Sequence, residues 1–396
     1  MTQDIKNRKI RMGMVGGGQG AFIGNIHRAA AFLDGEIELV CGAFSSSHQN
    51  CLNTGMALNV DASRCYANFN EMFTEEAKLP EDQRMQFVSI VTPNHLHFPV
   101  AKAALQSGFH VMSDKPATLT LDEVNELAEI VKQNNRLYGL THTYTGYPMV
   151  KEAHHRVAAG ELGDVVKVVV EYSQGWLADK DSEAGKQASW RLDPARAGAS
   201  CCMGDIGVHA ANLAEHITDL KIEALCADLT SVVDGRTLDD DGTVLLKFNN
   251  GAKGVLISSQ ISVGEENNLS IRIYGTKAAL EWRQQEPNTL IMKFNDKPSL
   301  MIRAGVGELS PAATQAMRTP AGHPEGYIEA FANIYGQFVQ QIRTFEQNSA
   351  EGVVGNAPGI TEAIRGMAFI ENVVAASHSS EKWHPFLLSN VNLAGE

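Results

Sequence analysis

A run of glycines near the start of the chain constrains its fold more than any other feature. Val15-Gly16-Gly17-Gly18-Gln19-Gly20-Ala21 follows a predicted strand over residues 9–15 and precedes a predicted helix over 21–33. Backbone N–H groups at such a helix start can bind a pyrophosphate, whose approach a Cβ atom would block. A plain glycine turn is the alternative, but the position after the first strand of a βαβ pattern favours a dinucleotide site. The residues expected to border the cofactor here are Gly16, Gly18, Gln19, Gly20 and Ala21.

The second predicted strand, over residues 36–43, leads into Phe44-Ser45-Ser46-Ser47-His48. An Asp or Glu usually grips the adenosine ribose of NAD at this point, and an Arg accommodates the 2′-phosphate of NADP. This segment contains none of the three. Ser45 and Ser46 can hydrogen-bond either cofactor, so the sequence predicts NAD or NADP without choosing between them.

Short apolar runs alternate with helical stretches up to about residue 141, which indicates parallel strands joined by right-handed crossovers. Further strands are predicted over 87–91, 109–112 and 137–141, with helices over 99–108 and 121–134. After about residue 147 the strands become longer and alternate, and turns such as Asn250-Gly251 favour antiparallel hairpins. These strands are predicted over 164–172, 243–248, 252–261, 269–274, 279–283 and 289–294. Helices are expected over 205–217 and near 326–345 and 360–378, with a loop over 303–325.

The chain has 396 residues, too many for one ordinary hydrophobic core. We predict an α/β Rossmann domain with a doubly wound parallel sheet over residues 1–146. An α+β domain with an open-faced, mostly antiparallel sheet is predicted over 147–396, with C-terminal helices able to pack back on the first domain. The first domain would bind the dinucleotide, and the second would bind substrate and form the contacts between subunits.

Charge and cysteine usage exclude several classes of partner. The net charge is −13 and no cluster of Lys or Arg occurs, which argues against nucleic acid and anionic membranes. We find neither a signal peptide nor an apolar stretch long enough to span a bilayer. The six cysteines form no CxxC pair, which favours a reducing cytoplasm.

His95 and His97 lack further ligands nearby, so no metal site is predicted.

Two pairs of motifs resemble the Gfo/Idh/MocA family, named for glucose–fructose oxidoreductase, inositol dehydrogenase and a rhizopine-catabolism protein. The first pair is Thr92-Pro93-Asn94, within a segment from Ser89 to His97, and Asp114-Lys115-Pro116, which follows Gly108-Phe109-His110-Val111. The second is Trp190-Arg191-Leu192-Asp193-Pro194 and the Asp-x-Gly-x-His motif from Asp205 to His209. The chain departs from the family pattern with Asp114 in place of Glu, with Asn212 in place of a frequent Asp, and in an altered glycine-rich stretch over 198–204. The change to Asp114 keeps the charge, whereas the other two departures bear on the type of substrate more than on hydride chemistry.

The resemblance implies a Rossmann domain followed by an open-faced sheet domain, in dimers or tetramers joined through the outer face of that sheet. It implies transfer of hydride between NAD or NADP and a secondary alcohol or ketone of a sugar, cyclic polyol or sugar derivative. The segments after the strands are expected to border the cofactor, through Thr92, Pro93, Asn94, His97, Asp114 and Lys115.

Alcohol oxidation needs a group that takes the hydroxyl proton and a positive charge that favours the alkoxide. Lys115 follows a predicted strand of the parallel sheet, where ligands bind, although a solvated surface lysine is the commoner fate. Asp205 and His209 are four residues apart and would share one helix face. The resemblance makes His209 the acid/base and Asp205 a pocket residue; the alternatives are a core histidine and a plain N-cap. The substrate contacts expected are Tyr144, Trp176, Arg191, His209 and His323, and we expect both motif pairs to converge on one nicotinamide-lined cleft.

Two other functions remain open on the sequence alone. Some relatives hydrolyse glycosides through transient oxidation by bound NAD. Others are regulators that respond to dinucleotides, and these tend to lose the lysine or the Asp/His pair. Lys115, Asp205 and His209 are all present here.

Overall fold

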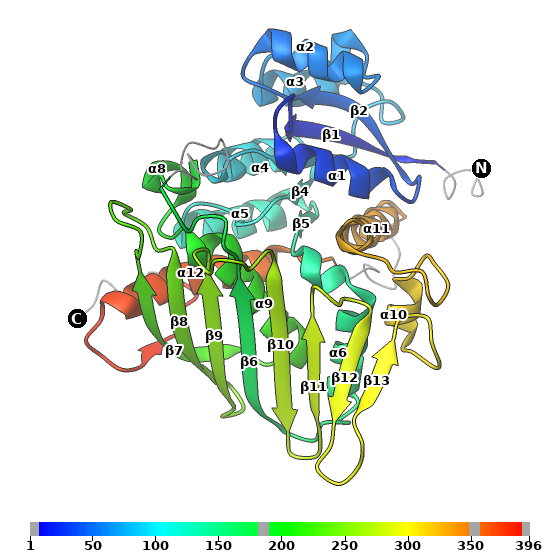
Figure 1. Ribbon diagram of the computed structural model, residues 1–396. Helices are drawn as coiled ribbons and strands as arrows, with labels where there is room; N and C mark the ends of the chain where they lie inside the picture. The colour runs from blue at the N-terminus through cyan, green and yellow to red at the C-terminus, as the bar shows by residue number, and fades with distance from the viewer. Residues whose placement is uncertain (1–7, 181–189, 348–356, 390–396) are drawn as a thin grey trace. The chain divides into compact units, whose positions relative to one another are not determined.

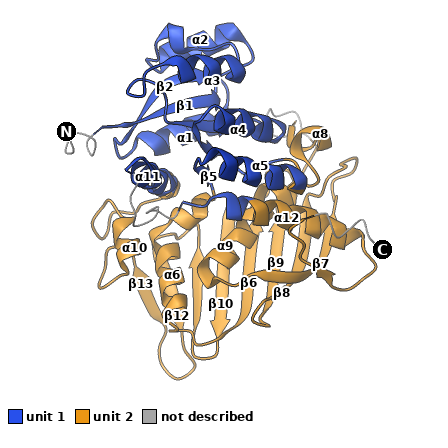
Figure 2. Ribbon diagram, turned by 180° about the vertical axis from the view of Figure 1, so that it is seen from behind, with its two compact units in different colours: residues 1–118, 122–141, 331–363 blue, residues 119–121, 142–330, 364–396 orange. Residues whose placement is uncertain are grey.

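The computed structural model describes residues 8–180, 190–347 and 357–389, which form two compact units (Figure 2). Unit 1 comprises residues 1–118, 122–141 and 331–363, and unit 2 comprises 119–121, 142–330 and 364–396. Residues 1–7, which precede the first predicted strand, lie outside the described residues. None of the helices in the described ranges is long and apolar enough to cross a membrane.

The boundary between the units differs from the predicted one. The continuous part of unit 1 ends at Thr141 rather than at residue 146, and residues 331–363 return to it. The residues after Thr141 belong to unit 2 because Gly146 packs directly on the backbone there: a Cβ on Gly146 would lie 2.0 Å from the carbonyl oxygen of Ala330.

Unit 1 contains a five-stranded parallel sheet in the order β2-β1-β3-β4-β5, which confirms the doubly wound fold (Figure 1). All side chains of β3 and β4 are buried, as expected for a parallel sheet covered on both faces. The strand order reverses at β1, where ligands bind outside the carboxyl ends of the strands. The strands are β1 (Ile10–Gly16), β2 (Ile37–Ala43), β3 (Phe87–Val91), β4 (His110–Ser113) and β5 (Tyr138–Leu140).

The predicted helices of this unit are present, but two further helices were not predicted. Both α2 (His48–Ala57) and α3 (Phe69–Lys78) begin at a polar cap, Ser47 and Asn68. The few apolar residues of α2 give no clear helical periodicity, so its cap was the only signal for it. The other helices are α1 (Phe22–Phe32), α4 (His97–Gln106), α5 (Leu121–Asn134) and α11 (Tyr327–Glu346), with short turns η2 (Ala62–Arg64) and η3 (Asn94–Leu96).

Unit 2 contains a nine-stranded sheet in the order β13-β12-β11-β10-β6-β9-β8-β7-β14. Its pairs are antiparallel except for β6 with β9, so the prediction of a mostly antiparallel sheet is confirmed. The strands are β6 (Val165–Ser173), β7 (Ile222–Thr230), β8 (Asp241–Phe248), β9 (Lys253–Ser259), β10 (Asn268–Gly275), β11 (Ala279–Arg283), β12 (Thr289–Lys293), β13 (Leu300–Arg303) and β14 (His384–Pro385).

Helices cover one face of this sheet (Figure 1). On the other face alternate side chains, such as Leu245 of β8, remain exposed. The segment 303–325, predicted as a loop, contains the short helix α10, which begins after the Ser310 cap. The predicted helix over 205–217 begins earlier, and its first turn is a π-turn. The helical elements are η4 (Thr143–Gly146), α6 (Pro148–Ala158), α8 (Pro194–Ala197), η6 (Met203–Gly207), α9 (Val208–Thr218), α10 (Pro311–Gln315) and α12 (Ile360–His378).

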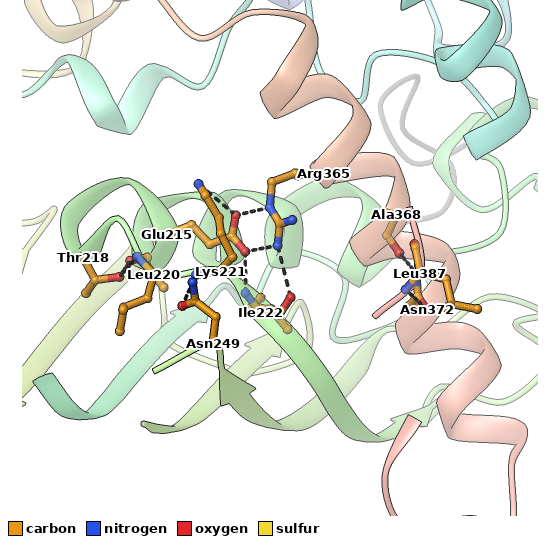
Figure 3. Close-up of polar contacts among 11 residues, drawn as sticks. Glu215, Thr218, Leu220, Lys221, Ile222, Asn249, Arg365, Ala368, Asn372 and Leu387 are labelled. Atoms are coloured by element: carbon orange, nitrogen blue, oxygen red, sulfur yellow. Dashed lines mark hydrogen bonds and ion pairs between the residues drawn. The ribbon is translucent and has the colours of Figure 1, made fainter. Parts of the chain in front are cut away.

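Glu215, near the end of α9, joins three elements of unit 2 (Figure 3). Its buried carboxylate accepts two hydrogen bonds from Arg365 of α12 and one from the backbone of Ile222, at 2.9 Å. Removing one partner of a buried ion pair leaves the other uncompensated, so we expect Glu215→Ala to reduce the free energy of unfolding by about 2–4 kcal/mol. Glu75→Ala, which breaks an exposed pair with Lys78, should change it by less than about 0.5 kcal/mol. Thermal unfolding of both variants tests this, and equal shifts would contradict it.

Candidate active site

The glycine loop has the shape that a dinucleotide requires. Gly16, at the end of β1, has a φ of +88°, and a Cβ there would lie 2.8 Å from the carbonyl oxygen of Val91. A Cβ on Gly18 would lie 2.8 Å from the carbonyl oxygen of Phe44. Ala21 is the N-cap of α1 and has no side-chain acceptor for the N–H groups of the first turn. These residues therefore fit a pyrophosphate, which would accept from that turn.

A close contact that the sequence did not reveal lies behind this loop. A Cβ on Gly24 would be 2.4 Å from the Cα of Gly17, so only glycine lets α1 pack this closely on the loop. The guanidinium of Arg28 donates to the carbonyl oxygen of Gly17 at 2.9 Å. The sequence did offer one signal for this contact: Gly24 lies inside a predicted helix, where glycine is unfavourable unless a close packing contact requires it.

The segment after β2 lies beside the same loop. The backbone N–H of Gly18 donates to the carbonyl oxygen of Phe44 at 3.0 Å, and that of Gln19 donates to Thr54 of α2 at 3.2 Å. Ser45 is half-buried and Ser46 is exposed. The two serines thus follow β2 where an adenosine ribose is gripped in related folds.

His97 braces the two loops that follow β3 and β4. Its buried ring lies between two carbonyl oxygens, with Nε2 2.8 Å from Thr92 and Nδ1 2.6 Å from Pro116. Burial lowers the pKa of His97, against the opposing effects of Asp114 and of these two carbonyls. A neutral ring donates to only one of the two oxygens. Thr92, Pro93 and Asn94 form the turn that His97 holds, and their contact with the cofactor stays a prediction.

Asp114 and Lys115 follow β4 at the carboxyl edge of the parallel sheet. Oδ1 of Asp114 accepts from the backbone N–H of Lys115 at 2.9 Å and from Oγ1 of Thr141 at 2.8 Å. Burial alone would raise the pKa of the Asp114 carboxyl, but His27, Lys115 and His97 together hold it below its usual range. The carboxylate next to the predicted catalytic lysine is therefore charged at neutral pH. The Lys115–Pro116 peptide is cis.

In unit 2, Asp205 lies in the π-turn η6 that precedes α9. The plain N-cap alternative for Asp205 is wrong, because Asp239 is the acceptor at this helix start. The Asp239 carboxylate accepts from the backbone N–H groups of Cys201 at 3.0 Å and Met203 at 2.9 Å. Single π-turns within helices occur often at functional sites, and here the turn leaves the Asp205 side chain for other partners.

Two side chains hold the Asp205 carboxylate. Oδ2 accepts from Nε of Arg191 at 3.1 Å and from Nε2 of Gln260 at 2.9 Å. Gln260 is fully buried and was not predicted. The Arg191 guanidinium also stacks over the rings of Trp190, at 4.4 Å, and Trp176, at 5.9 Å. The structure thus brings three predicted residues, Asp205, Arg191 and Trp176, into one cluster.

His209 lies one turn into the same helical stretch and is buried. Its Nδ1 is 3.5 Å from Nδ1 of His142, and its ring packs edge-on against Tyr144 with centroids 4.9 Å apart. Two Nδ1 atoms form a hydrogen bond only when one carries the proton and the other accepts it. His142 follows β5 and was not singled out in the sequence.

A chain of polar contacts continues from Tyr144. Its hydroxyl contacts that of Tyr172, which donates to Oδ1 of Asn267 at 2.6 Å. Gln174 donates to the same Asn267 oxygen at 2.7 Å and accepts from the indole N–H of Trp176 at 2.8 Å. We call Tyr144, Tyr172, Gln174, Trp176 and Asn267 the polar array. Tyr172 and Asn267 were not predicted. The signal for Tyr172 was that it precedes Gln174 and Trp176 at intervals of two residues, near the end of β6.

The structure does not place His323 in the polar array. Its side chain is exposed, and its Nδ1 lies 3.3 Å from the carbonyl oxygens of Pro320 and Ala321 in its own turn. His216 of α9 is half-buried and stacks on His154 with centroids 5.5 Å apart. Burial lowers the pKa of His216 to about 3.

Two family models match the chain, one for each part of the fold. Residues 10–142 match the model described as an oxidoreductase family with an NAD-binding Rossmann fold, and residues 150–281 match the GFO/IDH/MocA C-terminal domain. The uncharacterized oxidoreductase YfiI of Bacillus subtilis is 34% identical over 96% of this chain and 98% of its own. Levoglucosan dehydrogenase of Pseudarthrobacter phenanthrenivorans is 24% identical over 82% and 86%.

A solved structure also superimposes on nearly the whole chain. The inositol dehydrogenase homologue of Azotobacter vinelandii complexed with NAD+ has a TM-score of 0.92 at 34% identity, over 96% of this chain and 98% of its own. The same homologue was crystallised with NADH and myo-inositol, with a TM-score of 0.90. Together with the glycine loop and both motif pairs, these matches show that the chain belongs to the GFO/IDH/MocA family of NAD-binding oxidoreductases.

Proposed function

We propose that this protein is a dehydrogenase that moves a hydride between NAD and a secondary alcohol or ketone of a sugar, cyclic polyol or sugar derivative. The observation that carries the proposal is the polar array beside His209. It combines hydroxyls, amides and an aromatic face, which suit a ligand with many hydroxyl groups and apolar ring faces. The related structure with myo-inositol supports the same class of substrate.

The residues of unit 2 supply the proton chemistry in this proposal. His209 takes the proton of the substrate hydroxyl, since histidine titrates near neutral pH and serves both directions of the reaction. With its Nδ1 turned to His142, the ring presents Nε2 to the substrate. Asp205, held by Arg191 and Gln260, accepts from a substrate hydroxyl.

Lys115 supplies the positive charge for the same step. A lysine ammonium close to the reacting oxygen stabilises the alkoxide that forms as the proton leaves. When bound, NAD accepts the hydride from the oxidised carbon. NAD is the cofactor that the family match supports, although no side chain after β2 excludes the 2′-phosphate of NADP.

A substrate screen tests the proposal. NAD+ and NADP+ are each incubated with inositols, hexoses, glycosides and anhydrosugars, and net nicotinamide reduction is followed by absorbance. We expect reduction with at least one polyol or sugar. Cleavage of a glycoside without net reduction would instead indicate a glycosidase that uses bound NAD. Tight binding of NAD with neither reaction would indicate a regulator.

The proposal extends to the assembly and to the compartment. We infer a homodimer or homotetramer formed through the outer face of the nine-stranded sheet, where Val169, Val255 and Leu245 lie side by side in the strand register. Light scattering of the purified protein checks this, and a monomer at micromolar concentration would contradict it.

All six cysteines are free thiols, which supports a cytoplasmic location.

A further inference from the structure

His27 of α1 is fully buried at the centre of a hydrogen-bonded network in unit 1. Its Nδ1 lies 2.7 Å from the hydroxyl of Tyr335 on α11 and 3.4 Å from the hydroxyl of Ser89 on β3. The two hydroxyls are 2.9 Å apart. On the other side of the ring, Nε2 faces Oδ2 of Asp114 at 3.8 Å. Three elements distant in sequence therefore meet at the His27 ring, whose other side faces the carboxylate that precedes Lys115.

We propose that His27 is a positioning residue, whose imidazole holds the Asp114 carboxylate and through it the backbone of Lys115, and that Tyr335 sets the position of the imidazole proton. The inference rests on the proposed function in one respect: it takes Lys115 to be the lysine that acts on the substrate. The contacts that carry it all lie within unit 1 and do not depend on that role.

The hydroxyl groups of Tyr335 and Ser89 bear on whether the His27 nitrogen that faces Asp114 carries a proton. Burial raises the pKa of Tyr335, against the opposing effect of its bond to Ser89, so its hydroxyl keeps its proton. We take one of the two hydroxyls as the donor to Nδ1 of a neutral His27. The proton of the ring is then on Nε2, directed at Asp114. A protonated ring also directs an Nε2–H group at Asp114, so the donor is present in both charge states.

The two oxygens of Asp114 contact different groups in this arrangement. Oδ1 receives the backbone N–H of Lys115 and the hydroxyl of Thr141, as described above. Oδ2 faces His27. Oδ1 is held by two hydrogen bonds, and the contact of Oδ2 with His27 opposes rotation of the carboxylate, which would release the backbone N–H of Lys115. The network therefore fixes the point from which the lysine side chain extends.

The chemistry of the surroundings explains why a histidine rather than an apolar residue occupies position 27. The ring packs edge-on against Phe331, with centroids 4.7 Å apart. An apolar side chain could make the same packing contact. Within the described residues Nε2 has no hydrogen-bond partner at normal distance. A buried donor left unsatisfied is destabilising, and the negative charge of Asp114 at 3.8 Å offsets that cost here.

Three variants and a matched control test the inference, with NAD as the probe and the substrate found in the screen. His27→Leu should lower kcat by ~10–100-fold, as loss of outer-shell support commonly does. The dissociation constant for NAD should stay within about 3-fold, because the glycine loop is untouched. His27→Gln, whose amide can accept from Tyr335 and donate to Asp114, should recover part of kcat. Tyr335→Phe should lower kcat less than His27→Leu, since Ser89 remains within reach of Nδ1.

His110→Leu is the matched control. His110 is another buried histidine of unit 1, and its Nδ1 accepts from the backbone of Leu137 at 2.9 Å. The substitution should lower the midpoint of thermal unfolding and leave kcat within about 2-fold, as expected for a residue that acts on packing alone. If His27→Leu changes only stability, as His110→Leu should, the inference is wrong.

A double-mutant cycle shows whether His27 acts through Asp114. In an Asp114→Asn background, His27→Leu should change kcat by less than about 2-fold, because the carboxylate that it holds is already gone. Independent losses that multiply would overturn the inference.

The titration of Asp114 separates this inference from the proposed function. Carboxyl NMR of selectively labelled protein needs no substrate. His27→Leu or His27→Gln should alter the pKa of Asp114, with a rise in the leucine variant, because His27 is one of the groups that lower it, beside Lys115 and His97. An unchanged pKa in the leucine variant would refute the link, even if the wild-type protein oxidises a polyol. Absence of any oxidation together with a raised pKa would refute only the proposed function.

Discussion

Lys115→Ala is expected to lower kcat/KM for polyol oxidation by ~10²–10⁴-fold. The reason is electrostatic: in the proposed mechanism the ammonium charge stabilises an oxygen that becomes negative as the proton leaves, and such stabilisation acts mainly in the transition state. Binding of NAD should change by no more than a few-fold, since the pyrophosphate is assigned to the glycine loop. Steady-state kinetics and nucleotide titration measure the two quantities separately.

Lys102→Ala is the matched control for this prediction. Lys102 lies in the same unit, on α4, and its ammonium pairs with the exposed Glu126 at 2.6 Å. A surface pair of this kind contributes little, so we expect kcat/KM to stay within about 2-fold. Lys115→Arg adds a second test, because it keeps the charge but cannot release its proton. Full activity in Lys115→Ala would remove the lysine from the mechanism.

His209→Asn is expected to lower kcat by ~10²–10⁴-fold, the usual range for loss of a general acid or base. Asparagine keeps a polar group of similar size but cannot exchange a proton at neutral pH. The pH dependence of kcat should therefore lose the limb that reports this histidine. His142→Asn should give a smaller loss, since it removes the partner of Nδ1 and leaves the proton-accepting ring in place.

His216→Asn tests whether the effect is specific to position 209. His216 lies seven residues further along α9, is half-buried and stacks on His154 rather than on the polar array. We expect His216→Asn to leave kcat within about 3-fold, with a lower unfolding temperature as its main effect. Equal losses of kcat in the two variants would mean that His209 is a core histidine, the alternative that the sequence left open.

Periodicity located the elements that carry strong local signals. The strand Phe87–Val91 and the helix Leu121–Asn134 have the predicted bounds, because an unbroken apolar run and a capped amphipathic helix are specified by neighbouring residues. Helix α2 was missed because its polar residues hide the helical period. Strands β7 and β13 were missed too. Each pairs with its neighbour along the chain, β8 and β12, but few of their side chains are fully buried. The alternation of apolar and polar residues that marks a half-buried strand is therefore absent.

The candidate site divides in the same way. The glycine loop, Lys115, Asp205 and His209 were identified because each belongs to a compact motif. Gln260 and Asn267, by contrast, lie in no motif. Gln260 reaches Asp205 because β9 ends beside η6, and Asn267 reaches Gln174 because β10 begins where β6 ends. His27 carries no local signal for the Tyr335 contact, which spans 308 positions along the chain.

By itself, the order of residues determined the family, the dinucleotide loop and the alternation of strands and helices, because these depend on spacings of a few residues. The tertiary structure alone decided that residues 331–363 return to the first unit and that Asp239 caps the helix of Asp205. It also decided which side chains hold Asp114. Such contacts join groups far apart in the chain, and their partners are selected by the packing of whole elements rather than by any nearby pattern.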